Sequence, residues 1–162
     1  MRTYFRTGAV TARAVDVVSF SIDGGETYAL VGESGCGKSV TALSIMGLLA
    51  IPPAEIVSGA MGFEGRDLVT MDEDEWRRLR GSEMAMIFQE PMTSLNPVFR
   101  VGDQISESVL HHMDVSKKEA GERAIAALSR VGIAFPERRA RQYPHELSGG
   151  MRQRDMIAMA LA

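Results

Sequence analysis

The feature that most constrains the fold is a glycine-rich octapeptide at residues 32–39, Gly-Glu-Ser-Gly-Cys-Gly-Lys-Ser, here called the phosphate loop. A short apolar run at residues 27–31 precedes it, and a helical stripe of apolar residues begins at Val40. The pattern G-x-x-x-x-G-K-[ST] between a strand and a helix predicts a loop whose backbone N–H groups surround phosphates. We therefore expect an α/β protein that binds a nucleotide through this loop.

The residues of the phosphate loop have separate predicted roles. Gly32, Gly35 and Gly37 permit backbone conformations and close approaches that a Cβ would block. Lys38 is expected to place its ammonium group on the β- and γ-phosphates of ATP, and the Ser39 hydroxyl is expected to ligate Mg²⁺. The remaining predicted nucleotide contacts are Ser34, Cys36 and Val40.

Composition limits the other classes of function. The 162 residues carry a formal charge of −3, without the basic excess that is typical of proteins that bind nucleic acid nonspecifically. The longest apolar stretch, residues 45–56, is broken by Gly47, Pro52 and Pro53, so no membrane span is expected. Cys36 is the one cysteine, which is typical of a reducing compartment. We expect a soluble, cytoplasmic protein that does not bind nucleic acid.

Periodicity and turn signals predict the other elements. Strands are expected around residues 3–5 and at residues 15–22, 27–31, 58–63 and 84–88. Helices are expected after Val40, after a capping box formed by Thr70 and Glu73, over residues 104–113, after a second capping box formed by Ser116 and Glu119, and from about residue 148. Gly132 is the predicted stop of the helix that begins at Ser116. This order predicts an α/β core with a helical insertion.

A second motif, Leu-Ser-Gly-Gly-Met-Arg-Gln-Arg at residues 147–154, is here called the signature. By itself, Ser-Gly-Gly is a common helix cap or turn. Ser148, Gly149 and Gly150 at a helix start also make a site that can approach a γ-phosphate. Downstream of the phosphate loop, the segment resembles the LSGGQ signature of ATP-binding-cassette (ABC) ATPases. The resemblance implies that the signature of one subunit covers the ATP held by the phosphate loop of its partner.

Two further predictions come from this resemblance. Residues 87–97, Ile-Phe-Gln-Glu-Pro-Met-Thr-Ser-Leu-Asn-Pro, resemble the cassette Q-loop, in which Gln89 would reach Mg²⁺ and the attacking water. Phe5 is the first choice, ahead of Tyr4, for the aromatic residue that stacks on adenine. A strand core position is an equally good interpretation of Phe5.

The residues that flank the motifs are similar to those of the oligopeptide, dipeptide and nickel branch of ABC import ATPases, and the similarity covers the whole chain. It implies a P-loop NTPase fold of the ABC type, with an N-terminal antiparallel β part and a helical subdomain. The expected division is residues 1–90, residues 91–150, and a signature helix over residues 148–162. The implied partners are a second ABC ATPase subunit, membrane permease subunits that contact residues 89–102, and indirectly a substrate-binding protein. The implied location is the cytoplasmic face of the cell membrane.

Two departures from the family pattern qualify this interpretation. The Walker B aspartate, the catalytic glutamate, the D-loop and the switch histidine all follow the signature helix in the family, and the sequence ends at Ala162 before them. We expect an N-terminal fragment without hydrolytic activity of its own, with apolar faces left uncovered. Asp155 stands where the family has an aliphatic residue. Its carboxyl group would either be buried with a raised pKa or face solvent.

Three alternatives remain open from the sequence. A non-transport ABC protein usually carries coiled coils, zinc modules or basic arms, and none is seen between Ser39 and Leu147. A kinase or GTPase with a P-loop would lack the signature. The chain could also be an inert remnant that binds nucleotide weakly or not at all.

Overall fold

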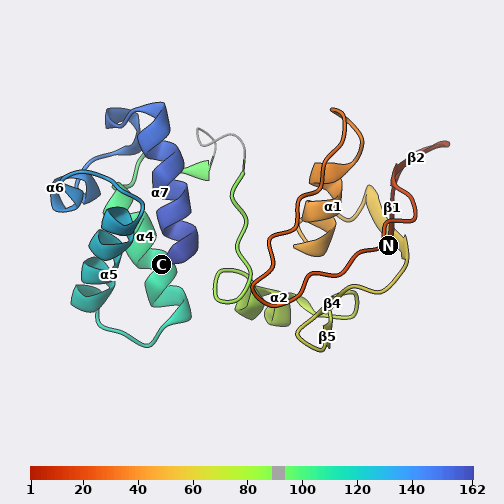
Figure 1. Ribbon diagram of the computed structural model, residues 1–162, viewed down its shortest axis with the longest axis horizontal. Helices are drawn as coiled ribbons and strands as arrows, with labels where there is room; N and C mark the ends of the chain where they lie inside the picture. Colours follow the sequence, from red (N-terminus) through yellow and green to blue (C-terminus); the bar gives the residue numbers. More distant parts are fainter. Residues whose placement is uncertain (89–93) are drawn as a thin grey trace. The chain divides into compact units, whose positions relative to one another are not determined.

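The computed structural model describes residues 1–88 and 94–162. The chain divides into two compact units, Met1–Trp76 and Arg77–Ala162, which we call the N-terminal unit and the helical unit (Figure 1). The predicted boundary at residue 90 lies outside the described residues and stays a prediction. Within the described part of the chain, every helix is too short or too polar to cross a bilayer.

The N-terminal unit contains a three-stranded antiparallel sheet of β1 (Arg2–Thr7), β2 (Val10–Val15) and β3 (Ala54–Ser58), in the order β2-β1-β3. The predicted antiparallel β part is therefore confirmed. A second hairpin joins β4 (Gly62–Phe63) to β5 (Arg66–Asp67). The two turn residues, Glu64 and Gly65, both have a positive φ, 46° and 79°, which is the conformation that two-residue hairpins favour.

Helix α1 (Lys38–Ile45) packs on this sheet through hydroxyl groups. Thr41 and Ser44 are buried, and the Ser44 Oγ lies 3.0 Å from the Oγ1 of Thr3 in β1. Val40, where the predicted apolar stripe begins, is half-buried. Ser44 can be buried against β1 because Thr3 offers its hydroxyl a hydrogen-bond partner.

Two of the predicted strands in this unit are wrong. Residues 16–37 form no strand, and Figure 1 shows a long irregular connection between β2 and α1. Residues 27–31 were expected to be a buried parallel strand, yet the Val31 side chain is 89% exposed. A parallel strand of this kind depends on hydrogen-bonded neighbours and on cover for both faces, and none of the described strands runs beside this segment.

Further corrections concern residues 58–88. The single strand expected at residues 58–63 is not found. Two strands border this range instead: β3 ends at Ser58, and β4 is a separate strand over Gly62–Phe63. The strand expected at residues 84–88 is absent from the described structure, where Met84 makes only an isolated bridge with Arg80.

Helix α2 (Glu73–Leu79) spans the boundary between the units, and its predicted cap is wrong. Asp72 and Glu75 form the reciprocal capping bonds, at 2.8 and 2.9 Å, instead of Thr70 and Glu73. The Thr70 hydroxyl donates instead to the carbonyl of Asp67.

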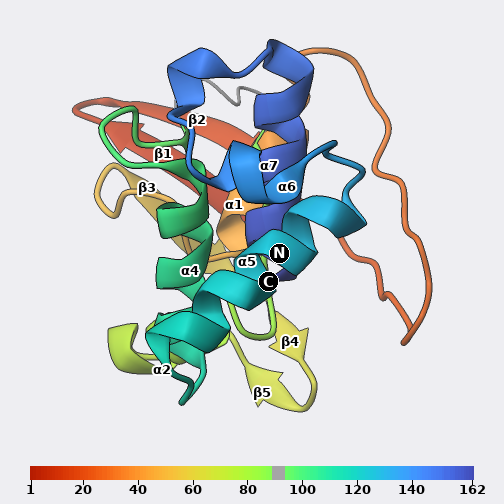
Figure 2. The same ribbon diagram turned by 90° about the vertical axis from the view of Figure 1, so that its left-hand side faces the viewer.

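The helical unit is built from α-helices packed around one core, as both ribbon views show (Figures 1 and 2). Its main elements are α4 (Val101–His112), α5 (Lys117–Arg130), α6 (Pro136–Ala140), the short 3₁₀ helix η1 (Pro144–Glu146) and α7 (Gly149–Leu161). Helix α5 contacts α4, α6 and α7. The core consists of Val101, Ile105, Ala124, Ala127, Leu128, Ile133, Leu147 and Ala158.

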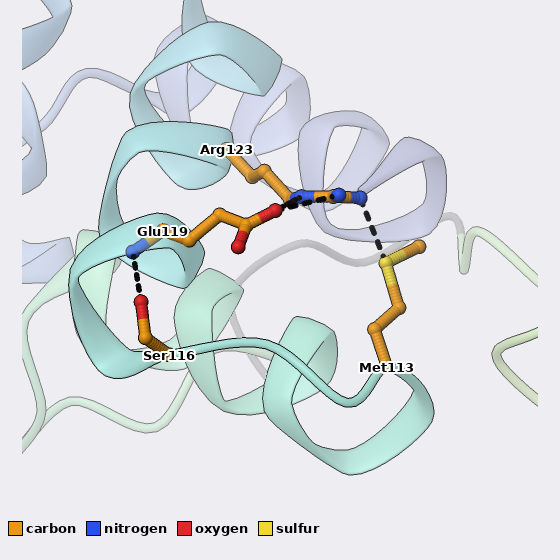
Figure 3. A network of polar contacts seen from close by, with 4 residues as sticks. All are labelled: Met113, Ser116, Glu119 and Arg123. Atoms are coloured by element: carbon orange, nitrogen blue, oxygen red, sulfur yellow. Dashed lines mark hydrogen bonds and ion pairs between the residues drawn. The ribbon is translucent and has the colours of Figure 1, made fainter.

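The predicted start and stop of α5 are confirmed. The Glu119 N–H donates to the Ser116 Oγ at 3.2 Å, and Gly132 follows the helix with a φ of +76°. The Glu119 carboxylate does not close the capping box, because it accepts from Arg123 at 2.9 Å (Figure 3). Arg123 also donates to the Met113 sulfur, so one guanidinium ties the first turn of α5 to the end of α4.

Candidate nucleotide-binding site

The phosphate loop leads directly into α1 through a left-handed glycine. Gly37 is the N-cap of α1, with a φ of 92° and a ψ of 4°. A Cβ at this position would collide with the backbone carbonyl oxygen of Ala14 at the end of β2. The position therefore requires glycine for two reasons, backbone conformation and space. In this way β2 fixes the point at which the loop becomes a helix.

Lys38, the first residue of α1, curls back over the loop. Its Nζ donates to the carbonyl oxygens of Gly32 at 2.8 Å and Glu33 at 2.7 Å, and lies 3.5 Å from the Cys36 Sγ. The ammonium is thus held at the loop by exposed neutral acceptors. A phosphate oxygen, being anionic, is a stronger acceptor than these carbonyls.

The N-terminus of α1 offers uncapped donors. The helix has neither a side-chain cap nor an acidic residue in its first turn. Among the described residues, the backbone N–H groups of Lys38, Ser39 and Val40 have no hydrogen-bond acceptor. Free N–H groups, the positive end of the helix dipole and a lysine side chain are the groups that bind anions at helix N-termini. The predicted phosphate contacts Lys38, Ser39 and Val40 lie at this end of α1.

The signature forms the start of α7 in the helical unit. Ser148 is the N-cap, and its Oγ accepts from the Met151 N–H at 3.3 Å. Gly149 and Gly150 are exposed, and a Cβ at either would meet nothing within 4 Å. The buried Leu147 anchors the segment to the core. The signature therefore presents bare backbone at a helix N-terminus, which is the geometry expected of a second phosphate contact.

Asp155 lies in α7 directly after the signature and is completely buried. Within the described structure, neither carboxylate oxygen has a hydrogen-bond partner. Burial raises the pKa of the Asp155 carboxyl group from 3.8 to about 7. Of the two possibilities left open by the sequence, the structure selects the buried one.

The two candidates for stacking on adenine, Phe5 and Tyr4, both lie in β1. Phe5 is half-buried in β1, opposite Ala12 and Ala54. The alternative, Tyr4, is already engaged, since its hydroxyl donates to Asp16 and the Arg13 guanidinium lies 5.6 Å from its ring centre.

Gln89, the predicted Mg²⁺ and water contact, lies outside the described residues. Ser39 is exposed at the start of α1. No cluster of three or more histidine, cysteine, aspartate or glutamate side chains suited to a metal ion occurs in residues 1–88 and 94–162. Ser39 is thus the one predicted Mg²⁺ ligand whose position is described.

Comparison with known proteins identifies the family. The family model described as ABC transporter matches residues 15–162, which is most of the chain. The chain belongs to the ABC transporter family. The predicted fold class is therefore confirmed.

Curated relatives of this ABC chain share about half of its residues. It is 51% identical to the oligopeptide transport ATP-binding protein AppD of Bacillus subtilis, over all of this chain and 49% of that protein. It is 55% identical to a putative peptide import ATP-binding protein of Brucella abortus, over 99% of this chain and 49% of that protein. The chain thus spans about half the length of the curated relatives it matches.

A solved ABC cassette has the same fold. The cassette MJ0796, determined as a dimer in a post-hydrolysis state with ADP and Pi, matches with a TM-score of 0.86 at 26% identity. The match covers 99% of this chain and 66% of that one.

Sequence reasoning missed three hydroxyl residues that support the ABC phosphate loop. The Thr41 Oγ1 donates to the carbonyl of Gly37 at 2.9 Å and so fixes the residue that begins α1. The Ser44 Oγ donates to the carbonyl of Val40 and lies within hydrogen-bond distance of Thr3. The available signal was the presence of Thr41 and Ser44, three residues apart, in an otherwise apolar helix.

Proposed function

We propose that the intact protein is the ATP-binding and ATP-hydrolysing subunit of an ABC importer for peptides. The observation that supports this most is the structure of the phosphate loop. The Lys38 side chain and the free N–H groups of α1 lie together there, next to Gly37, where β2 leaves no room for a Cβ. The names of its relatives support the substrate class, because those at 51–55% identity are oligopeptide, dipeptide and peptide transport proteins.

In this proposal each residue has one task. The N–H groups of Lys38, Ser39 and Val40 hold phosphate oxygens, and the Lys38 ammonium leaves its loop carbonyls to neutralise the β- and γ-phosphates. Ser39 and Gln89 contact Mg²⁺, which would supply charge neutralisation on the phosphates when bound. Phe5 stacks on adenine. Ser34, Gly35 and Cys36 line the phosphates.

The signature completes the site of a second ABC ATPase subunit. Ser148, Gly149 and Gly150 would approach the γ-phosphate held by the partner's phosphate loop, because their backbone and hydroxyl groups are exposed at the start of α7. The dimeric state of the related cassette supports this arrangement. Two copies of the site would then close on two ATP molecules.

The permease would dock on the segment that precedes α4. Val98 and Phe99 expose 70% and 53% of their surfaces there. Gln104 holds the segment rigid, since it accepts from the Asn96 N–H and donates to the carbonyls of Asn96 and Phe99 at 2.9–3.0 Å. Exposed apolar side chains on a fixed loop suit a protein contact. Docking there would hold the protein at the cytoplasmic face of the membrane.

The test uses the intact protein reconstituted with its permease subunits and substrate-binding protein in liposomes. We expect uptake of a labelled oligopeptide that requires ATP and is abolished by Lys38→Ala. Phe99→Ser should weaken co-purification with the permease while ATP binding is retained. If the parent protein, with Lys38 in place, shows no ATP-dependent uptake of any peptide, the importer assignment is refuted. If the Lys38→Ala variant shows full uptake, the assigned nucleotide site is refuted.

A further inference from the structure

A groove in the helical unit lies between α4, α5 and α6, away from the signature residues. It encloses about 330 Å³ and is open to solvent. This volume is at the lower end of the range for small-molecule sites. All of its lining residues belong to the helical unit, so the groove needs no contribution from the phosphate loop.

The α4 and α6 sides of the groove, here called its walls, each carry one basic and one acidic side chain. At the start of α4 the wall offers Arg100 and Asp103, and on the α6 side it offers Glu137 and Arg141. None of these four side chains forms an ion pair with another described residue. The Arg100 guanidinium is positioned by the Tyr143 ring, 6.0 Å from its centre.

The α5 side of the groove, here called its floor, is lined by Lys118, Gly121, Glu122 and Ile125. Gly121 lies in the second turn of α5, where glycine lowers helix stability relative to alanine. A Cβ at Gly121 would meet nothing within 4 Å, so packing inside the chain does not require glycine there. By contrast, a Cβ at Gly102 would lie 2.8 Å from Ala140. Glycine is needed at that position because α4 and α6 approach each other closely there. At Gly121 the missing side chain leaves the floor open.

We propose that this groove binds a small zwitterion, such as an amino acid or a short peptide with free termini. The ligand's carboxylate pairs with an arginine on one wall, and its ammonium group pairs with the carboxylate on the opposite wall. Its backbone lies over Gly121 and beside Ile125. The inference goes beyond the proposed transport function, because binding to the helical unit requires neither ATP nor a permease.

The experiment titrates the 162-residue chain with dialanine and follows backbone amide shifts by NMR. We expect saturable shifts confined to α4, α5 and α6. The analogue N-acetyl-dialanine amide, which lacks both charges, should not bind. Arg100→Gln and Glu137→Gln, one on each wall, should each weaken dialanine binding about tenfold, as expected for the loss of one charge-assisted hydrogen bond.

Gly121→Leu is the decisive variant, because it fills the floor and is expected to raise Tm through better helix propensity. It should abolish dialanine binding in a fully folded protein. Ala126→Leu, on an exposed position of the same helix, is the matched control and should bind normally. Absence of saturable binding at millimolar dialanine, equal binding of the blocked analogue, or normal binding by Gly121→Leu would each overturn the proposal. None of these results bears on ATP binding, so the two proposals fail separately.

Discussion

Among single residues, Asp155 carries a clear energetic cost. Its carboxyl group is fully buried on α7, and neither oxygen has a partner in the described structure. Burying an ionised carboxylate without compensation costs several kcal/mol, and the group instead takes up a proton. The folded helical unit therefore holds Asp155 neutral over most of the pH range below 7.

The stability of the chain should consequently fall as the pH rises. The pKa of Asp155 is raised in the folded state, so its contribution is fully present below the unfolded value of 3.8 and is lost as the pH rises through about 7. The linked change in unfolding free energy is on the order of 4 kcal/mol between pH 3.8 and pH 7, and about 3 kcal/mol of it falls above pH 5. Asp155→Val should remove this pH dependence and stabilise the protein at pH 8. Urea unfolding at pH 5 and pH 8 measures both effects.

The control for this prediction is Asp114→Val, at an exposed position in the loop between α4 and α5. It should leave the pH dependence as it is in the parent chain. If Asp155→Val unfolds with the same pH profile as the parent chain, Asp155 is not a buried neutral acid.

At the scale of the element, α1 depends on the conformation of Gly37. Gly37→Ala places a methyl group against the Ala14 carbonyl at a φ of 92°, so β2 or the helix start must move. We expect a loss of unfolding free energy of about 1–3 kcal/mol, as is usual for overpacking and strained backbone. Thermal unfolding measures it. Gly24→Ala, where a Cβ meets open space, is the matched control and should change Tm little.

Helix α7 depends in a similar way on its cap. Ser148→Ala removes the acceptor for the Met151 N–H, which should cost about 1 kcal/mol in unfolding free energy. Chemical denaturation is the measurement, with Ser129→Ala on the exposed side of α5 as the comparison. A Ser148→Ala variant as stable as the Ser129→Ala variant would mean that the cap does not stabilise α7.

At the scale of the whole chain, prediction from sequence mostly succeeded where the signals are local. Ser116, Ser148 and Gly132 act through neighbours within a few residues, and the structure places the two serines at helix N-caps and Gly132 after α5. The capping box expected of Thr70 and Glu73 is a local exception, because Asp72 and Glu75 form the capping bonds instead. The helix that follows the phosphate loop was likewise predictable, and Gly37 and Lys38 stand at its start.

Prediction failed where an element depends on distant partners. An apolar run such as residues 27–31 becomes a buried strand only when other strands pair with it, and the described residues supply none. The burial of Thr41 and Ser44 in α1 was not predicted, because the partner of Ser44 is Thr3, more than thirty residues earlier in the sequence. The burial of Asp155 likewise follows from tertiary packing, so the sequence left two possibilities open.

The central claim is that the phosphate loop binds ATP through Lys38. The direct measurement is a titration of this chain with a fluorescent ATP analogue and Mg²⁺, compared with Lys38→Ala and with Lys117→Ala, an exposed lysine of α5. We predict saturable binding that weakens tenfold or more in Lys38→Ala, since a hydrogen bond to a charged group contributes about 1.5–3 kcal/mol. Lys117→Ala should bind as the parent chain does. Absence of binding, or equal affinity in all three proteins, would contradict a role of Lys38 in ATP binding.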